Sequence, residues 1–406
     1  MNVKQQMITA DELSESITRL DGWITRNQWK GYDPFDGLNG ETLRRLTFEI
    51  HLLKIAQQQL IRRFPLNLRP LLGIQKQTSS KGMGYCAVGY LKLYQATGDP
   101  AYYRKMESCL TWLRDNYCRG YAGYAWGNHF DYVSRGGRIP PNVPSIVWTS
   151  LIGYTFCQAF EAFGDKSHLD TAASACEFLL GDVARYTDAD GTICFMYTPR
   201  GNSAASRRGC VHNANALAAR LLARVYKHTR RAELLGPAEE AIRFTLKHQE
   251  SDGSWYYGVS NKFRWVDSFH TGYVLEALHG YKEAIGDATC EHSLRSGFNF
   301  FFRKFFDADG APRYYSTRKY PIDIQCASQG IQTLVNLRGY QPCALETASE
   351  VVRWTVRHMQ DKQGYFYFRK YPFVTNRTPM FHWGQSTMLA ALGTMLEVTS
   401  SGVQKE

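Results

Sequence analysis

Apolar and mixed segments alternate along most of this chain. Six segments rich in small and apolar residues begin near positions 82, 144, 210, 267, 323 and 380, at spacings between 56 and 66 residues. A helix that is apolar on most faces is buried on most faces. More polar, amphipathic segments precede each of them, near 41–64, 102–117, 167–184, 233–249, 288–306 and 344–360. A repeat of this period is typical of stacked helical hairpins.

Similar turns mark the ends of these segments. The apolar helices end in QATGD (95–99), EAFGD (161–165) and EAIGD (283–287), and turns such as TDADG (187–191) and QESDG (249–253) follow the mixed ones. We predict an all-α, single-domain (α/α)6 barrel, with the apolar helices inside. The alternative is an open solenoid, which usually has polar capping repeats, whereas the last apolar segment stays apolar to its end. The predicted boundaries are a lead-in packed on the barrel (1–40), the toroid (41–398) and a tail (399–406).

Composition narrows the classes of binding partner and the cellular location that we expect. The chain has 406 residues and a formal net charge of +11, which favours anionic partners such as nucleic acid, a membrane surface or an acidic glycan. The first twenty residues contain no apolar signal core, and no run of 18 apolar residues occurs, so we expect a cytoplasmic protein without a transmembrane segment. The ten cysteines are scattered without a CxxC motif, which indicates reduced thiols.

The positive charge is concentrated in the loops that enter the apolar helices, which would share one face of a ring. Loops 120–143, 191–209, 253–266, 310–321 and 364–379 contain 13 basic residues, one acid (Asp131) and 21 of the 56 aromatic residues. Aromatic faces stack on sugars, and arginine binds carboxylates or phosphates in a bidentate manner. We therefore expect an anionic glycan at this mouth. Nucleic acid also suits arginine with aromatics, but the charge is confined to one pocket and no nucleic-acid motif occurs.

Candidate catalytic groups lie in or beside these loops. Asp131 is the lone acid of a basic rim, which should hold it ionised. Asp267 and His270 are three residues apart and share a helix face. Asp323 and His212 begin two other apolar helices. Asp267 and Asp323 also fit the simpler role of helix N-caps.

The predicted substrate-binding residues are aromatic, basic or amide side chains near the same mouth: Trp126, Arg135, Arg208, Trp255, Trp265, Gln325, Arg377, His382, Trp383 and Gln385. Paired carboxylates there would suit glycoside hydrolysis. A histidine or tyrosine beside arginine would suit proton abstraction next to a uronate carboxylate, for elimination or epimerisation. The sequence leaves these chemistries open. We expect no metal and no cofactor, because no metal-ligand spacing, P-loop or dinucleotide motif occurs, and the two DADG turns fit plain turns better than calcium loops.

Several segments carry a family resemblance. The hairpin period, with QESDGSWYYG and WVDSFHTGYVLEAL, resembles the six-hairpin glycosidase-like superfamily, which includes glycoside hydrolases, polysaccharide lyases and sugar epimerases. GYDPFDGLNG, LNLRPLLGIQK, FDYVSRGGRIPPNVP, VHNANALAARLLARVY, DIQCASQGIQTL and FHWGQSTMLAAL are similar to proteins of about 400 residues associated with bacterial capsule and exopolysaccharide biosynthesis. In that family Gln325 is often replaced by histidine, which argues against a base at this position.

The resemblance implies a carbohydrate-active protein acting on an anionic oligosaccharide or polysaccharide, free or linked to a lipid or nucleotide, together with polysaccharide-assembly proteins. Hydrolase or lyase chemistry is the first hypothesis. A uronyl or acylamino-sugar epimerase, with His212, His270 or His382 as acid or base, is the second. A non-catalytic glycan-binding or assembly scaffold is the third.

Overall fold

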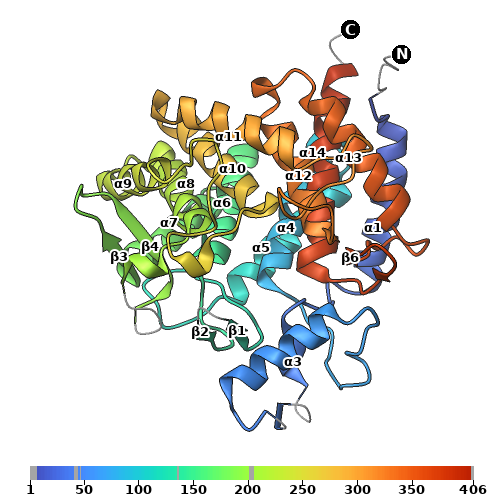
Figure 1. The fold of residues 1–406 in the computed structure, drawn as a ribbon. Helices are drawn as coiled ribbons and strands as arrows, with labels where there is room; N and C mark the ends of the chain where they lie inside the picture. The colour runs from blue at the N-terminus through green and yellow to red at the C-terminus, as the bar shows by residue number, and fades with distance from the viewer. Residues whose placement is uncertain (1–6, 41–43, 46, 135–136, 201–204, 404–406) are drawn as a thin grey trace.

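The structure is a computed structural model that describes residues 7–40, 44–45, 47–134, 137–200 and 205–403. Six helices form an inner ring: α4 (Ser80–Thr97), α6 (Ile146–Phe163), α8 (His212–Thr229), α10 (Ser268–Ile285), α12 (Ile324–Asn336) and α14 (Ser386–Val403). Each packs against the next, and α14 packs against α4, so the ring is closed (Figure 1). The predicted toroid is confirmed, and the open solenoid is excluded.

An outer helix follows each of the first five inner helices: α5 (Pro100–Asp115), α7 (Lys166–Gly181), α9 (Leu235–Leu246), α11 (Glu291–Lys304) and α13 (Ala344–Met359). The sixth outer helix is α1 (Ala10–Arg26), which packs against α14. Asp21 of α1 accepts hydrogen bonds from Tyr90 and Lys105 on one side, and Ser16 donates to Gln360 on the other. The N-terminal region expected to be a lead-in therefore supplies a wall of the barrel, because its apolar face completes the last hairpin.

The segment near 41–64 was expected to supply the first outer helix, but it takes another position. Its helix is α3 (His51–Arg63), which packs on the short helix η1 (Asp36–Asn39) and on strand β1 (Tyr132–Ser134). It lies across the end of the barrel where the loops enter the inner helices (Figure 1). We call this end the loop end of the barrel.

The loops carry small antiparallel sheets that the hydrophobic pattern did not predict. Strand β1 pairs with β2 (Gly137–Ile139), β3 (Val183–Thr187) with β4 (Ile193–Pro199), and β5 (Ile322–Asp323) with β6 (Arg369–Lys370), which pairs with β7 (Thr375–Asn376). Short helical turns complete the connections: η2 (Arg207–Gly209), η3 (Ala232–Leu234), η4 (Asn261–Phe263), η5 (Ala288–Cys290), η6 (Arg338–Tyr340) and the π-turn η7 (Phe381–Gln385). None of the described helices is long and apolar enough to cross a bilayer.

Local chemistry sets the ends of the inner helices. Ser79, Ser145, Asp267 and Asp323 cap the N-termini of α4, α6, α10 and α12 by accepting backbone N–H bonds. Gly98, Gly164 and Gly286 end α4, α6 and α10 with φ between 70° and 78°, a left-handed conformation that favours glycine. The repeated GD turns are therefore helix stops followed by an aspartate at the next helix start.

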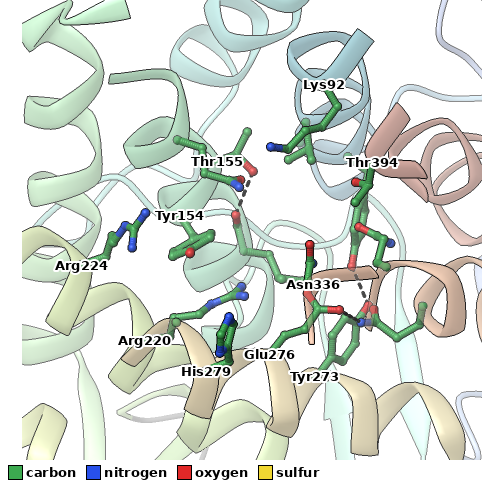
Figure 2. Close-up of a pocket in the computed structure, with 18 of the residues that line it drawn as sticks. Lys92, Tyr154, Thr155, Arg220, Arg224, Tyr273, Glu276, His279, Asn336 and Thr394 are labelled. Carbon is green, nitrogen blue, oxygen red and sulfur yellow. Dashed lines mark hydrogen bonds between the residues drawn. The ribbon is translucent and has the colours of Figure 1, made fainter. Parts of the chain in front are cut away.

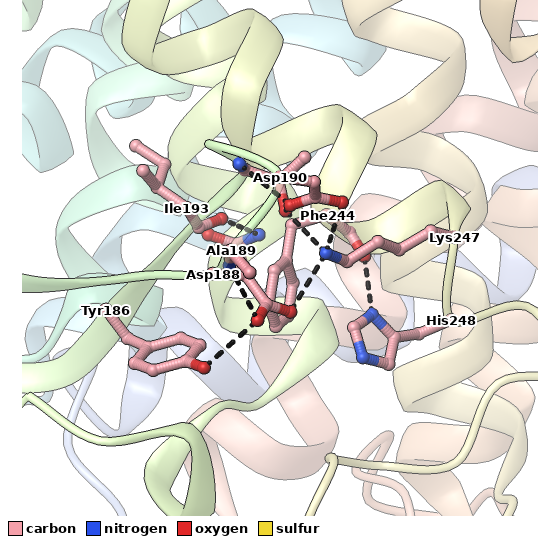
Figure 3. A network of polar contacts seen from close by, with 10 residues as sticks. Tyr186, Asp188, Ala189, Asp190, Ile193, Phe244, Lys247 and His248 are labelled. Atoms are coloured by element: carbon pink, nitrogen blue, oxygen red, sulfur yellow. Dashed lines mark hydrogen bonds and ion pairs between the residues drawn. The ribbon is translucent and has the colours of Figure 1, made fainter.

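The first DADG turn is an ordinary turn held by a lysine (Figure 3). Lys247 on the chain after α9 places Nζ 2.9 Å from Asp188 and 2.7 Å from Asp190. The same lysine donates to Thr192, and these bonds hold the pKa of Asp190 well below its ordinary value. The ammonium group thus lies where a cation would sit between the two carboxylates.

Candidate functional site

A cavity of about 300 Å³ lies inside the inner ring. Residues of all six inner helices line it, some of which Figure 2 shows. The lining runs along the barrel axis from Lys81 in the first turn of α4 to Asn336 at the end of α12. Asn336 and Arg338 line its outer end and are exposed, so the cavity reaches solvent there. Its volume lies within the range of small-molecule sites.

Lys81 lies at the deep end of this axial cavity, in the first turn of α4. It is 5% exposed, and its Nζ lies 5.6–6.0 Å from the ring centroids of four aromatic residues, Tyr85, Trp148, Tyr273 and Trp383. Burial lowers the pKa of Lys81 to about 8, although Asp33 opposes the shift. A lysine with this pKa has a substantial neutral fraction near physiological pH and can accept a proton.

Two tyrosines form the wall beside Lys81. The hydroxyl groups of Tyr85 and Tyr273 are 2.6 Å apart, and the amide of Gln325 donates to Tyr273 at 2.9 Å. Burial raises the pKa of both phenols, so both stay neutral. Lys81 Nζ lies 5.7 and 5.6 Å from the centroids of these two rings, so a base and two acidic hydroxyl groups border the same end of the cavity.

A buried histidine and aspartate lie behind Lys81, toward the loop end. Nδ1 of His382 contacts the carboxylate of Asp33, and the His382 ring is 5.2 Å from the ring of Trp148. Burial, with Lys81 and His129 nearby, keeps the pKa of His382 well below its ordinary value, so its imidazole is neutral. Burial also raises the pKa of Asp33. The loop end of the axis therefore holds two nitrogen bases, the neutral imidazole of His382 and Lys81, whose lowered pKa leaves a fraction of its amine unprotonated.

The N-terminal segment is fixed over this region by a buried ion pair. Arg69 donates to Asp36 at 2.7 Å and to the carbonyl of Asp33 at 2.8 Å. Gly82 permits the close approach of η7, because a Cβ there would lie 2.7 Å from Phe381 and 3.3 Å from His382. These contacts position Asp33 and His382 beside Lys81.

Cations also dominate the middle and outer parts of the cavity (Figure 2). Arg224 is paired with Glu161, and Lys92 with Glu397. Arg220 is 6% exposed, its guanidinium lies 3.9 Å from the Tyr154 ring centroid, and no described carboxylate lies within ion-pair distance of it. Glu276 on the neighbouring helix α10 is hydrogen-bonded to Gln329 and Thr333; burial raises its pKa, and the nearby Arg220 opposes this shift. Arg220 is thus available to bind an anionic group inside the cavity.

The rim carboxylates predicted to be catalytic are held in separate hydrogen-bonded groups. Asp131 forms a two-pronged ion pair with Arg138 at 2.9 Å. Asp323 accepts bonds from Arg369, from the indole of Trp383 and from the backbone of Gln325. Neither carboxylate lines the axial cavity, although the Trp383 ring that is bonded to Asp323 lies 5.7 Å from Lys81 Nζ.

Asp267 and His270 form a dyad on another face of α10. His270 Nδ1 lies 2.7 Å from Asp267 Oδ2, which also accepts a bond from Trp265 at 2.9 Å. Both line a recess of about 10 Å³ with His212 and Trp255, enough for roughly one water. Tyr273 and Glu276 of the same helix line the axial cavity. Because successive residues of a helix are rotated by about 100°, the His270 side chain leaves the helix about 60° away from that of Tyr273 and about 120° away from that of Glu276. Burial lowers the pKa of His212 to about 3.

The predicted binding residues divide in the same way. Trp383, His382 and Gln325 lie at the axial site. Trp126 and Gln385 do not face a ligand: Trp126 is fully buried between Tyr124 and Phe156, and Gln385 is bonded to the backbone of Phe366. Trp255 donates to the Thr245 carbonyl in the core beside the recess, and Trp265 stacks on Tyr257. Arg208 and Arg377 are exposed at the loop end, and Arg135 lies outside the described residues.

Lys81, Tyr85, Tyr273, Glu276 and Arg220 were not predicted. The sequence did contain a signal for such residues, because polar and ionisable side chains recur on helices whose other residues are small and apolar. Gln325, Gln329 and Gln332 on α12 show it most clearly, at spacings of four and three residues that place them on one face.

Comparisons with solved structures identify the fold. The chain matches a cellobiose 2-epimerase from Bacillus thermoamylovorans (TM-score 0.63, 11% identity, 81% of this chain and 90% of that one). It also matches a GH76 α-mannanase from Bacteroides thetaiotaomicron (0.60, 13%, 82% and 90%) and a glycosyl hydrolase of family 88 from Bacteroides vulgatus (0.57, 11%, 96% and 99%). No family model and no curated protein matches the sequence. These matches define the fold class of this chain, which is the six-hairpin α/α toroid.

Proposed function

We propose that the protein is a carbohydrate-active enzyme that moves a proton on an anionic sugar bound in the axial cavity, by elimination or epimerisation. The observation that carries this proposal is the placement of two buried nitrogen bases, Lys81 with its lowered pKa and the neutral imidazole of His382, at the same end of the cavity as the neutral phenols of Tyr85 and Tyr273. The similarity of the fold to sugar epimerases and glycoside hydrolases supports a sugar substrate.

The geometry gives hydrolysis by paired carboxylates less support. That mechanism needs two carboxyl groups facing one another across the substrate, with one of them able to donate a proton. Asp131 and Asp323 each have an arginine partner, and Asp267 is bonded to His270 and Trp265. All three carboxylates are engaged with partners of their own, and none of them lines the axial cavity.

In the proposed reaction, Arg220 binds the anionic group of the sugar and Lys81 accepts a proton from the carbon next to it. A neutral phenol then stabilises the developing enolate by donating a hydrogen bond. In epimerisation one of the phenols donates a proton to the opposite face of that carbon and is reprotonated by the Lys81 ammonium. In elimination the bond from the next carbon to its substituent oxygen breaks, and that oxygen takes a proton from a phenol, which the Lys81 ammonium then restores. The aromatic residues around Lys81 exclude water, which strengthens these polar interactions.

The dyad of Asp267 and His270 is a second candidate centre for the same chemistry. Its support is the 2.7 Å contact that orients the imidazole and leaves Nε2 without a partner among the described side chains. A sugar ring would need the recess beside it to widen. The sequence resemblance supports a role for either centre in capsule or exopolysaccharide synthesis, on a substrate that is free or attached to a lipid or nucleotide.

Solvent exchange tests the proposal. The protein is incubated in deuterated water with uronate-containing oligosaccharides and with N-acylhexosamines, and the products are examined by NMR and by ultraviolet absorbance. Deuterium at the carbon next to the carboxylate or carbonyl indicates epimerisation, and a new conjugated double bond indicates elimination. New reducing ends without either signal would overturn the proposal in favour of hydrolysis, and binding without turnover would favour a scaffold.

Variants then separate the two centres. Arg220→Gln should raise KM more than it lowers kcat, and Arg224→Gln, whose residue is already paired with Glu161, is the matched control. Loss of exchange in His270→Gln, with full exchange in a Lys81 variant, would assign the reaction to the dyad and contradict the axial site.

A further inference from the structure

Helix α3 turns polar residues toward the protein and leucines toward solvent, which is the reverse of an ordinary surface helix. It buries Lys54, Gln58 and Ile61 against the protein, where Lys54 is 3% and Gln58 0% exposed. Its outward face carries Leu52, 74% exposed, and Leu60, 61% exposed. Surface helices normally turn the apolar stripe to the core, so the outward face of α3 is suited to an apolar partner.

Other apolar side chains extend this face. Nine of the ten large hydrophobic residues exposed in the described part of the chain belong to it; the tenth is Tyr103 on α5. We call these nine the α3 patch: Phe48, Ile50, Leu52, Leu53, Leu60, Leu66, Leu71, Phe373 and Val374. Isolated exposed apolar residues are normal, but a concentration in one region marks an interaction site.

Two segments distant in sequence build the patch. Phe373, which is fully exposed, and Val374 form the tip of the hairpin between β6 and β7. The side-chain amide of Asn376 in β7 donates to the carbonyl of Phe64 at 2.8 Å, which ties this tip to the end of α3. The apolar surface is therefore held in place by the fold.

The charged residues around the patch are almost all basic. Arg44, Arg45, Arg63, Lys76 and Arg377 are exposed there. Among the described residues of 44–76 and 366–378 the one acid is Glu49, which already contacts Lys54. An apolar face bordered by cations complements a surface that is apolar inside and negatively charged at its boundary.

We propose that the α3 patch docks on the surface of an anionic lipid bilayer, with the leucines of α3 and Phe373 inserted at the level of the headgroups. Amphipathic helices with basic borders bind in this way, through apolar burial and attraction to anionic lipids. A second copy of the chain fits less well, because a two-fold contact would bring the same arginines of both copies together. This inference does not depend on the proposed reaction.

Vesicle sedimentation tests the proposal with the full chain. The protein should sediment with vesicles containing phosphatidylglycerol, and much less with pure phosphatidylcholine vesicles or at high salt. The variant Leu52→Ser/Leu60→Ser/Phe373→Ser should bind the anionic vesicles at least about tenfold more weakly. Tyr103→Ser, which removes the exposed aromatic residue outside the patch, is the matched control and should bind like the parent.

Two outcomes would overturn the proposal. One is equal sedimentation of parent and triple variant with the anionic vesicles, when circular dichroism shows both to be folded. The other is a stable dimer of the parent in analytical ultracentrifugation that the triple variant loses, without any vesicle binding by the parent. The substituted side chains are exposed, so the fold should survive. A charge variant, Arg44→Gln/Arg63→Gln, provides an independent check, because it should weaken binding and reduce its dependence on salt.

Discussion

The loop-end rim and the barrel axis use ionisable residues in opposite ways. On the rim, Asp323 is bonded to Arg369 and Trp383, and Asp131 to Arg138, so each charge is matched. On the axis, Lys81 is buried among aromatic rings with a lowered pKa, and Arg220 has no described carboxylate partner. Matched charges hold loops in place, whereas unmatched ones in a cavity are available to a ligand. The two rim carboxylates therefore say more about how the loops are held than about the reaction.

The largest expected effect comes from removing the axial base. Lys81→Met should lower kcat by about 10²–10⁴-fold, the usual contribution of a general base. In the parent, kcat/KM should rise with pH and level off above about 8, because only the neutral amine accepts a proton. Lys92→Met, which changes the cavity lysine paired with Glu397, should keep most of the activity. Full activity in Lys81→Met would remove the axis from the mechanism.

Breaking the matched pair of the rim should reduce stability instead. Asp323→Asn leaves Arg369, whose side chain is 7% exposed, without its counter-charge, and should lower the free energy of unfolding by about 3 kcal/mol. Urea denaturation would measure the change.

Asp131→Asn is the comparison on the same rim. Its partner Arg138 has a side chain that is 47% exposed, so water can solvate the freed guanidinium, and the loss should be about 1 kcal/mol or less. Equal losses in the two variants would show that burial does not decide the role of these pairs.

The sequence predicted the ring but not this division of roles. Periodic apolar helices and GD stops are local patterns, so the hairpins and the inner ring could be read from them. Lys81 and His382 meet because the ring closes α14 on α4, and Tyr273 reaches Lys81 from α10; these residues are far apart in the chain. Asp267 was correctly placed at a helix start, but no local pattern says which carboxylates find a partner, and the arginine that pairs with Asp323 lies 46 residues away.

The placement of Arg220 can be tested through a glycine on the neighbouring helix. A Cβ at Gly280 would lie 2.8 Å from the Cδ of Arg220. Gly280→Ala should shift the guanidinium, raise KM and reduce stability by about 1–3 kcal/mol. Gly236→Ala on α9 is the control, because a Cβ there meets nothing within 4 Å, and it should leave KM unchanged. An unchanged KM in both variants would argue against Arg220 as the anion-binding group.

Acid should destabilise the protein through its buried histidines. Burial lowers the pKa of His129 to about 4 from an ordinary 6.5. Between these values the unfolded chain binds a proton that the folded chain does not, so stability falls as pH drops, by up to about 1.4 kcal/mol per pH unit for this group. His129→Asn should make the unfolding free energy less dependent on pH between 6.5 and 4, and an unchanged slope would contradict the assignment.

The smallest effect is expected at the surface turn of Figure 3, which extends the comparison to partly exposed groups. Asp188 and Asp190 resemble the start of a calcium loop, yet Lys247 lies 2.9 and 2.7 Å from their carboxylates. A bound ammonium group and a calcium ion compete for the same oxygens, and the other ligands of a calcium loop do not follow in the sequence. Adding calcium should leave the melting temperature of the parent unchanged, as measured by differential scanning fluorimetry. Stabilisation by calcium that Lys247→Met increases would instead show that the lysine blocks a cation site, and the rule that matched charges are structural would fail at this turn.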